Sequence, residues 1–431
     1  MTYDQAVKKI NSLLRFGIKP GLERVSKLLE YLGNPQKELR FVHVAGTNGK
    51  GTTCTLMASA LRQAGYRTGL FTSPYVIAFR ERFQINGEMI PEQTLAALLD
   101  EILPVVEQMA ENEEVITEFE LITALALLWF ARSRCDVVVL EVGLGGRFDA
   151  TNVIPTPLVS VIASISLDHT AILGDTLEQI AFEKAGILKQ GGVTVLYPDQ
   201  QPEVLQVIRR VAQERNNRLV LPDFSQLEEL GTDIHGTRLR YKGMALKLPF
   251  IGAHQMKNAA TAWEAIQVLR ERGLTISDPA VQQGFAAAAM PARMEVLSER
   301  PLVLLDGGHN PGCAGALRQV METYLSERKI VAIVGMMADK DSRTALSLVA
   351  PSFAEVLTVR PENPRALSAE ELAEEARTFC ARVKPMGDME AAFRLALGQA
   401  GEEGAVVICG SFFLAGEIRP IALKVLRQRQ K

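Results

Sequence analysis

A glycine-rich segment with one lysine and two threonines carries the clearest chemical signal in this sequence. Val44-Ala-Gly-Thr-Asn-Gly-Lys-Gly-Thr-Thr53 follows an apolar run and precedes an amphipathic stretch. Glycines let backbone amides wrap a phosphate without Cβ clashes, a helix N-terminus adds positive potential, and a lysine reaches the outer phosphates. Gly51 separates Lys50 from Thr52, so the segment is a variant of the usual Gly-Lys-Ser/Thr ending. This context favours phosphate binding over an empty glycine-rich turn, with Thr52 or Thr53 placed to help hold Mg²⁺.

Polar groups also follow the other predicted parallel strands, at the carboxyl edge where open α/β sheets bind ligands. They are Ser73, Glu141 and His169. Glu141 interrupts the run Val137-Val-Val-Leu-Glu-Val142, and an unpaired carboxylate buried there is costly, so a bound cation explains it. The alternative is a structural ion pair with Arg147. For His169 a loop hydrogen bond is the stronger alternative, because Mg²⁺ prefers oxygen ligands.

Lys184 is predicted to point inward from a helix. Thr176 and Gln179 have the spacing of a capping box, which starts that helix, and Lys184 shares its apolar face. Gly186 is predicted to end it. A lysine that faces the interior needs an anionic partner or a chemical reason. The commoner alternative is a lysine whose stem packs while its ammonium reaches water.

Near-continuous apolar runs that alternate with amphipathic stretches position these groups. They predict a mainly parallel sheet covered on both faces, in a P-loop-type α/β domain. The expected strands are 41–45, 67–72, 136–142 and 158–166, with a helix after Lys50 that closes near Gly65. Residues 238–248 alternate in period two around Lys242-Gly243, which predicts an antiparallel hairpin appended to this domain.

The strand and helix alternation restarts after a linker of small residues and proline at 286–292. Further strands are expected at 302–306, 330–334, 355–359 and 405–409. They predict a second, smaller, Rossmann-like α/β domain, so we expect one domain over 1–290 and another over 291–431.

Composition narrows the class of protein. The 431 residues carry 47 Lys plus Arg against 50 Asp plus Glu, a net charge of −3, which gives no basic surplus for nucleic acid or an anionic membrane. Five cysteines without paired or zinc-type spacing fit a reduced, cytoplasmic protein. The N-terminus has no secretion-signal pattern, and the longest apolar run, Leu121 to Ala131, is too short to span a bilayer.

Further short motifs follow one another along nearly the whole chain. They are His43 to Thr52, Thr72-Ser-Pro74, Phe79-Arg-Glu-Arg82, Ile85-Asn-Gly-Glu88, Glu141 to Asn152, Leu167-Asp-His169, Glu183-Lys-Ala-Gly-Ile187, His254-Gln255, Asn258-Ala-Ala260, Asp306-Gly-Gly-His-Asn-Pro311 and Gly410-Ser411. Taken together and in this order, these motifs resemble the folylpolyglutamate synthase and dihydrofolate synthase family within the Mur-ligase superfamily.

The resemblance implies a role for each matching position. ATP is bound by Asn48, Gly49, Lys50, Gly51, Thr52, Asn258, Arg293 and Asp306. Two Mg²⁺ ions are held at Ser73, Glu141 and His169. Lys184 matches a lysine that the family carbamylates with CO₂. Lys50, Lys184, His169 and His309 form the catalytic set, in which the role of His309 stays open.

The implied reaction joins L-glutamate to a folate through an acyl phosphate made with ATP, with dihydropteroate as a second possible acceptor. The resemblance also suggests a monomer. Tyr75, Ala292 and Gly308 depart from residues common in the family, and Tyr75 bears on substrate preference. Two alternatives stay open: a Mur-type amino-acid ligase of cell-wall precursor synthesis, and a nucleotide-gated binding protein without ligase activity.

Overall fold

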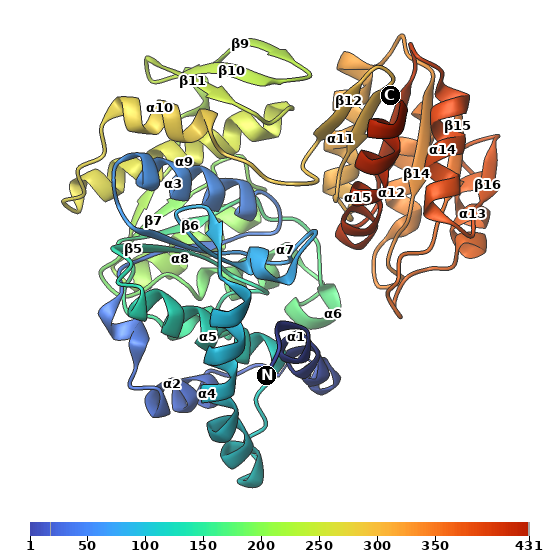
Figure 1. Ribbon diagram of the computed structural model, residues 1–431. Coiled ribbons are helices and arrows are strands. Elements are labelled where there is room, and N and C mark those ends of the chain that lie inside the picture. The colour runs from blue at the N-terminus through green and yellow to red at the C-terminus, as the bar shows by residue number, and fades with distance from the viewer. Residues whose placement is uncertain (18, 430–431) are drawn as a thin grey trace.

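The structure, a computed structural model, describes residues 1–17 and 19–429 and contains two bodies, each built on its own sheet (Figure 1). The larger sheet has the order β4-β3-β2-β5-β1-β6-β7-β8, with parallel pairing from β2 to β8 and antiparallel pairing at the β3 and β4 edge. Its strands are β1 (Phe41–Ala45), β2 (Thr68–Phe71), β3 (Phe83–Ile85), β4 (Glu88–Met89), β5 (Val137–Glu141), β6 (Val159–Ile162), β7 (Val193–Leu196) and β8 (Arg218–Val220).

Helices cover both faces of this sheet. Successive residues of β5 supply two different apolar clusters, Val137 and Val139 on one face and Val138 and Leu140 on the other. This is why the strands appear in the sequence as unbroken apolar runs. One face carries α3 (Lys50–Gln63), α9 (Ala253–Glu271) and α10 (Asp278–Ala286). The other carries α1 (Tyr3–Ser12), α2 (Glu23–Tyr31), α4 (Glu92–Glu111), α5 (Glu118–Arg132), α7 (Leu177–Ala185) and α8 (Pro202–Glu214).

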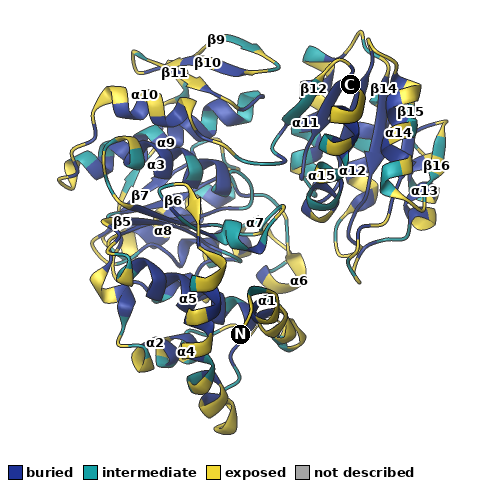
Figure 2. Cartoon of the chain, in the orientation of Figure 1, coloured by how far each residue is buried: buried dark blue, intermediate teal, exposed yellow. Residues whose placement is uncertain are grey.

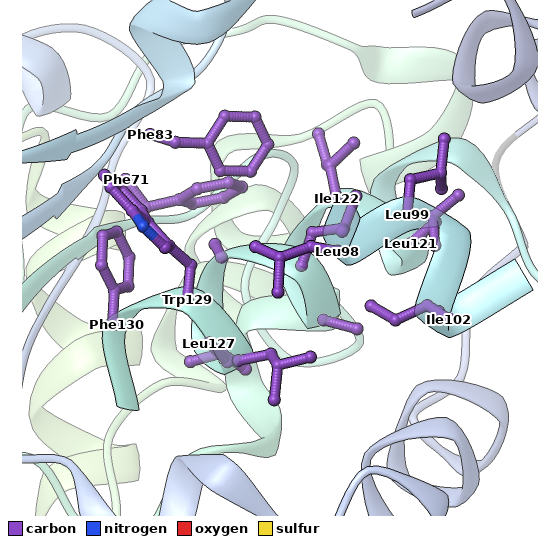
Figure 3. Packing of buried hydrophobic residues seen from close by; sticks show 14 of the residues in the cluster. Phe71, Phe83, Leu98, Leu99, Ile102, Leu121, Ile122, Leu127, Trp129 and Phe130 are labelled. Atoms are coloured by element: carbon purple, nitrogen blue, oxygen red, sulfur yellow. The ribbon is translucent and has the colours of Figure 1, made fainter. Parts of the chain in front are cut away.

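Burial follows these layers, with the sheet buried between exposed outer helix faces (Figure 2). Aromatic side chains fill one end of the core between the sheet and α5 (Figure 3). There the rings of Phe71 and Phe83 pack edge to face, with their centroids 5.8 Å apart. This packing anchors the end of β2 from which the Ser73 loop leaves.

The expected hairpin is confirmed and gains a third strand. The appendage consists of β9 (Leu227–Asp233), β10 (Gly236–Tyr241) and β11 (Met244–Leu248). Lys242 and Gly243 form the turn, with φ of +46° and +82°. The expected strand 158–166 is too long, because β6 ends at Ile162 and Ser164 turns to bridge Asn48 of the phosphate loop.

The smaller body is a second, mainly parallel sheet with the order β12-β13-β17-β14-β15-β16, in which only β12 pairs antiparallel. The strands are β12 (Glu295–Glu299), β13 (Leu302–Leu305), β14 (Ile330–Val334), β15 (Glu355–Thr358), β16 (Val383–Pro385) and β17 (Ala405–Cys409). The helices are α11 (Pro311–Tyr324), α12 (Ser342–Val349), α13 (Ala369–Arg377), α14 (Met389–Ala400) and α15 (Phe412–Arg429).

All four strands expected in this body are present, whereas β12 and β16 at its edges were not expected. Helix α10 ends at Ala286 and β12 starts at Glu295, so we keep residues 290 and 291 as the proposed domain boundary. The five cysteines are unpaired. Over the described residues, no helix combines the length and the apolar character needed to cross a membrane.

Candidate active site

The predicted phosphate loop connects β1 to α3 and needs glycine for two reasons. Gly46 and Gly49 have φ of +149° and +85°. A Cβ on Gly49 would also stand 2.5 Å from Oδ1 of Asn258, so α9 packs directly on the loop. The Lys50 ammonium folds back and donates to the carbonyl oxygens of Gly46 and Thr47, both at 3.1 Å. The loop is therefore preformed, with its lysine at the N-terminus of α3.

Gly51 explains why the motif departs from the usual ending. A Cβ at this position would lie 2.8 Å from the terminal methyl of Met290 and 3.8 Å from Oε2 of Glu141. The extra glycine thus makes room for the linker and for a carboxylate beside the loop. The Thr53 hydroxyl donates to the Gly49 carbonyl at 2.8 Å, which favours Thr52 over Thr53 as a cation ligand.

Glu141 closes β5 and is 4 % exposed. Its Oε2 accepts a hydrogen bond from the Ser73 amide at 3.2 Å, and within the described chain it forms no ion pair. The alternative pairing with Arg147 is wrong, because that guanidinium binds Glu183 at 2.7 Å. Burial raises the pKa of Glu141, and the nearby Lys50 ammonium opposes that rise. A buried carboxylate between Lys50 and Ser73 is suited to hold a cation.

Lys184 faces the interior as predicted and is 4 % exposed. The capping box of Thr176 and Gln179 starts α7, and the Lys184 ammonium donates to the Gly46 carbonyl at 2.9 Å. Burial and then the Lys50 charge lower the pKa of Lys184 to about 7. The alternative of an ammonium that reaches water is wrong.

Gly186 follows α7, but not as a left-handed cap. Its φ is −55°, and a Cβ there would stand 2.2 Å from the Cα of Arg147. The glycine is required because the 143–147 loop crosses the end of the helix, which fixes α7 and Lys184 against the sheet edge.

His169 lies at the same edge but turns toward the other domain. It has φ of +52°, its side chain is 39 % exposed, and its Nε2 lies 3.4 Å from Nζ of Lys340. Burial and then the Lys340 charge lower the pKa of His169, so its ring is neutral at physiological pH. In the described part of the chain, no hydrogen bond or ion pair joins His169 to Ser73 or Glu141, and its metal role stays a prediction.

The second sheet edge meets the first through contacts that the sequence analysis missed. Lys340 pairs with Asp168 at 2.9 Å, and both side chains are about nine-tenths buried. Asn310 donates to Asp168 at 3.3 Å and to Oδ1 of Asn48 at 3.1 Å. Burial alone would raise the pKa of Asp168, but the Lys340 ammonium lowers it to about 2. The available signal was the position of Lys340, shortly after the end of β14 at a carboxyl edge.

Three expected groups of the second domain gather near the linker. The Asp306 carboxylate accepts from the amides of Gly308 at 2.8 Å and Met294 at 3.1 Å. Burial raises the pKa of Asp306 and is opposed by Arg293, whose guanidinium lies 4.5 Å from the Phe412 ring centre. Burial lowers the pKa of His309 to about 4, so this ring is also neutral near pH 7.

These groups would suit a nucleotide-dependent cation site better than a free-standing metal centre. Over residues 1–17 and 19–429, no three His, Cys, Asp or Glu side chains come together closely enough to hold a metal. A single carboxylate with a serine beside a phosphate loop fits Mg²⁺, which is usually bound by one or two carboxylates plus substrate phosphates.

Both domains of the chain match known protein families. The Mur ligase middle-domain family matches residues 44–266, and the Mur ligase glutamate ligase domain matches residues 292–412. The chain is 35% identical over 407 residues to the dihydrofolate synthase/folylpolyglutamate synthase of Escherichia coli K12, covering 93% of this chain and 91% of that protein. It is 33% identical over 435 residues to the folylpolyglutamate synthase of Lacticaseibacillus casei, covering 98% and 99%.

Solved structures give the same result over nearly the full length. The folylpolyglutamate synthase of Mycobacterium tuberculosis complexed with ADP superposes with a TM-score of 0.88 at 32% identity, covering 97% of this chain and 99% of that one. E. coli FolC in complex with DHPP and ADP gives a TM-score of 0.84 at 33% identity, covering 99% and 98%.

Proposed function

This chain belongs to the folylpolyglutamate synthase and dihydrofolate synthase family of Mur ligases, and we propose how its residues divide the work of joining L-glutamate to a folate with ATP. The activity is that of an ATP-dependent, amide-forming ligase of folate metabolism. The alternatives, a cell-wall ligase or a binding protein without ligase activity, are not favoured, because near-full-length relatives are folate ligases.

One observation carries the assignment of residues: the carboxylate of Glu141 is buried between the Ser73 amide and the phosphate loop, without an ion-pair partner among the residues that the structure describes. We propose that ATP phosphates lie along Asn48, Gly49, Lys50, Gly51 and Thr52. We propose further that Asn258, Arg293 and Asp306 contact the rest of the nucleotide. Asn258 supports this role because its side chain lies so close to the loop that a Cβ added to Gly49 would stand 2.5 Å from its Oδ1.

The reaction then needs two displacements. The folate carboxylate attacks the γ-phosphorus of ATP, the bond to the β-phosphate oxygen breaks, and an acyl phosphate and ADP form. The glutamate amine attacks the acyl carbon, loses a proton, and phosphate leaves with the electrons of the broken carbon–oxygen bond. Lys50 neutralises charge on the transferred phosphoryl oxygens, and the preformed loop supplies positioning.

Mg²⁺ fits the residues present, and Glu141, Ser73 and the Thr52 hydroxyl would hold it. When bound, it supplies charge neutralisation at the phosphates. We propose two ions, with His169 and a carbamylated Lys184 at the second. His169 is neutral and therefore has a lone pair to offer, but its ring would have to turn from Lys340 toward the phosphate loop.

The buried amine of Lys184 is suited to carbamylation. With a pKa of about 7, a large fraction is neutral at physiological pH. Its nitrogen lone pair attacks the carbon of CO₂, electrons of one C=O bond move to oxygen, and the nitrogen loses a proton. The product is an anion in place of a cation, next to Lys50 and the Gly46 carbonyl. This exchange would remove the repulsion between Lys184 and Lys50.

His309 and the protein's assembly complete the proposal. The His309 ring is neutral and packs edge to face on Phe412 at 5.7 Å, so we propose that it orients substrate by hydrogen bonding and does not carry charge. We propose that the enzyme acts as a cytoplasmic monomer. Dihydropteroate is proposed as a second acceptor, since the E. coli relative carries both activities in its name.

An ADP-release assay tests the function. The purified chain is incubated with Mg-ATP, L-glutamate and either tetrahydrofolate or dihydropteroate, and products are identified by mass spectrometry. We expect ADP release coupled one to one to a product heavier by one glutamyl unit. ADP release only with UDP-linked muramyl acceptors would overturn the folate assignment. Release with tetrahydrofolate but not with dihydropteroate would remove the second acceptor alone.

A further inference from the structure

Two carboxylates hold the loop that carries Ser73, one at each end. Glu81 accepts hydrogen bonds from three successive backbone amides, those of Val76 at 2.8 Å, Ile77 at 2.9 Å and Ala78 at 2.8 Å. At the other end of this loop, the Ser73 amide donates to Glu141. The position of the loop therefore sets where the Ser73 side chain lies relative to the buried carboxylate.

The backbone of the C-terminal domain packs against the backbone of this loop. A Cβ added to Gly416, on α15, would stand 1.9 Å from the carbonyl oxygen of Val76. The Val76 side chain packs against the apolar cluster of the second sheet, which includes Leu414 and Ile418 of the same helix. No side chain fits at position 416 unless the loop moves.

Helix α15 is also fixed to the linker between the domains. Arg419, one turn after Gly416, forms a two-pronged ion pair with Glu295, with the closest approach 2.6 Å. Glu295 in turn accepts a hydrogen bond from the amide of Ala292 at 3.0 Å. Glu295, and less strongly Glu81, raise the pKa of Arg419. One helix face therefore joins the linker, the second sheet and the Ser73 loop.

We infer that α15 positions the Ser73 loop, and that Gly416 and Glu81 are positioning residues for the cation site. This site is therefore complete only when the C-terminal domain is docked. This inference rests on the proposed role of Ser73 as a cation ligand. The ion requirement of the enzyme then depends on a glycine in a helix of the other domain.

Hydrogen exchange on the unliganded full-length chain tests the link without any substrate. Gly416→Ala is compared with Gly398→Ala, a glycine of α14 whose added Cβ would meet nothing within 4 Å. We expect Gly416→Ala to speed exchange of the amides of Val76, Ile77 and Ala78 by about tenfold, the order expected from overpacking a close contact. Gly398→Ala should leave these amides unchanged. Equal exchange in wild type and Gly416→Ala, or equal acceleration across both domains, would overturn the inference.

A Mg²⁺ titration of ligase activity tests the consequence. Gly416→Ala and Glu81→Ala should raise the Mg²⁺ concentration for half-maximal rate severalfold and lower the rate at saturating Mg²⁺ much less. Glu81→Gln keeps one oxygen for the amides of Ile77 and Ala78 and should recover part of the loss. A lower maximal rate with an unchanged Mg²⁺ requirement would overturn the positioning role. A separate variant tests the proposed role of Ser73 as a cation ligand. If Ser73→Ala kept the wild-type Mg²⁺ requirement, that role would be wrong, whatever the effect of Gly416→Ala.

Discussion

The carboxyl edges of the two parallel sheets meet across the site, and they present charge in different ways. At the first edge, Glu141 and Lys184 are each 4 % exposed, and neither forms an ion pair within the described residues. At the second edge, Lys340 is already paired with Asp168 across the domain boundary, and Asp306 is satisfied by two backbone amides.

This difference separates two tasks. Burying a charged group without an oppositely charged partner costs free energy, and a bound ligand can offset that cost. Such groups are therefore the ones that we expect to contact the reactants. Groups that are already paired across the boundary stabilise the docked arrangement of the domains. We therefore propose that the first edge carries the phosphate and cation chemistry, and that the second edge closes over it.

The largest effect should come from removing the phosphate-loop lysine. Lys50→Ala should lower turnover about a thousandfold or more, since charge neutralisation dominates phosphoryl transfer. The fold should persist, because among the described residues the Lys50 ammonium hydrogen-bonds only to carbonyls of its own loop. Lys37→Ala, on an exposed lysine, is the control. ADP release measures the turnover, and circular dichroism measures whether the fold persists. Near-normal turnover of Lys50→Ala would refute the proposal that the first sheet edge carries the phosphate chemistry.

Lys184→Ala comes next and should lose about a hundredfold or more in rate, as removal of a group that stabilises developing charge does. A short carboxylic acid such as acetate should restore part of the activity by replacing the carbamate anion. Lys189→Ala is a control on a nearby lysine, because Lys189 is half-buried and donates to the Asn152 carbonyl, away from the phosphate loop. Wild-type rates for Lys184→Ala would contradict the carbamate proposal.

The carbamate should also depend on pH. Only the neutral amine reacts with CO₂, and with a pKa of about 7 the ammonium form of Lys184 dominates below that pH. Between about pH 6 and pH 8 the neutral fraction of Lys184 rises about tenfold, and carbamylation also releases a proton. At a fixed dissolved CO₂ that does not saturate the site, the carbamylated fraction should therefore rise by more than tenfold. Carbon-13 NMR with labelled CO₂ detects the carbamate carbon directly. A signal of equal size at both pH values, or one that persists in Lys184→Ala, would show that the assignment is wrong.

The smallest effect should come from the second edge. Asp168→Asn keeps the shape but removes the charge that pairs with Lys340, so the domains should dock less tightly. We expect a severalfold higher KM for ATP, a nearly unchanged kcat, and a larger radius of gyration by small-angle scattering. A large fall in kcat with an unchanged radius of gyration would show that Asp168 takes part in the reaction. The proposed difference between the two sheet edges would then be wrong.

Local sequence patterns were enough to predict the first edge. The phosphate loop, the buried Glu141 and the inward Lys184 follow from strand and helix periodicity within short segments. The second edge was not predictable in this way, because Lys340 and Asp168 lie 172 residues apart and meet only through domain docking. The edge strands β12 and β16 were not predicted for another reason. They are short or only partly buried, so their sequences lack the continuous apolar run by which the other strands were predicted.

The most direct test is a crystal structure of this chain with a non-hydrolysable ATP analogue and Mn²⁺, with the ion located by anomalous scattering. We expect triphosphate along Gly49 to Thr52 and Mn²⁺ at about 2.2 Å from a Glu141 oxygen and the Ser73 hydroxyl, the distance range of hard-cation oxygen ligands. An ion bound away from Glu141, or a nucleotide bound outside the Lys50 loop, would contradict this expectation.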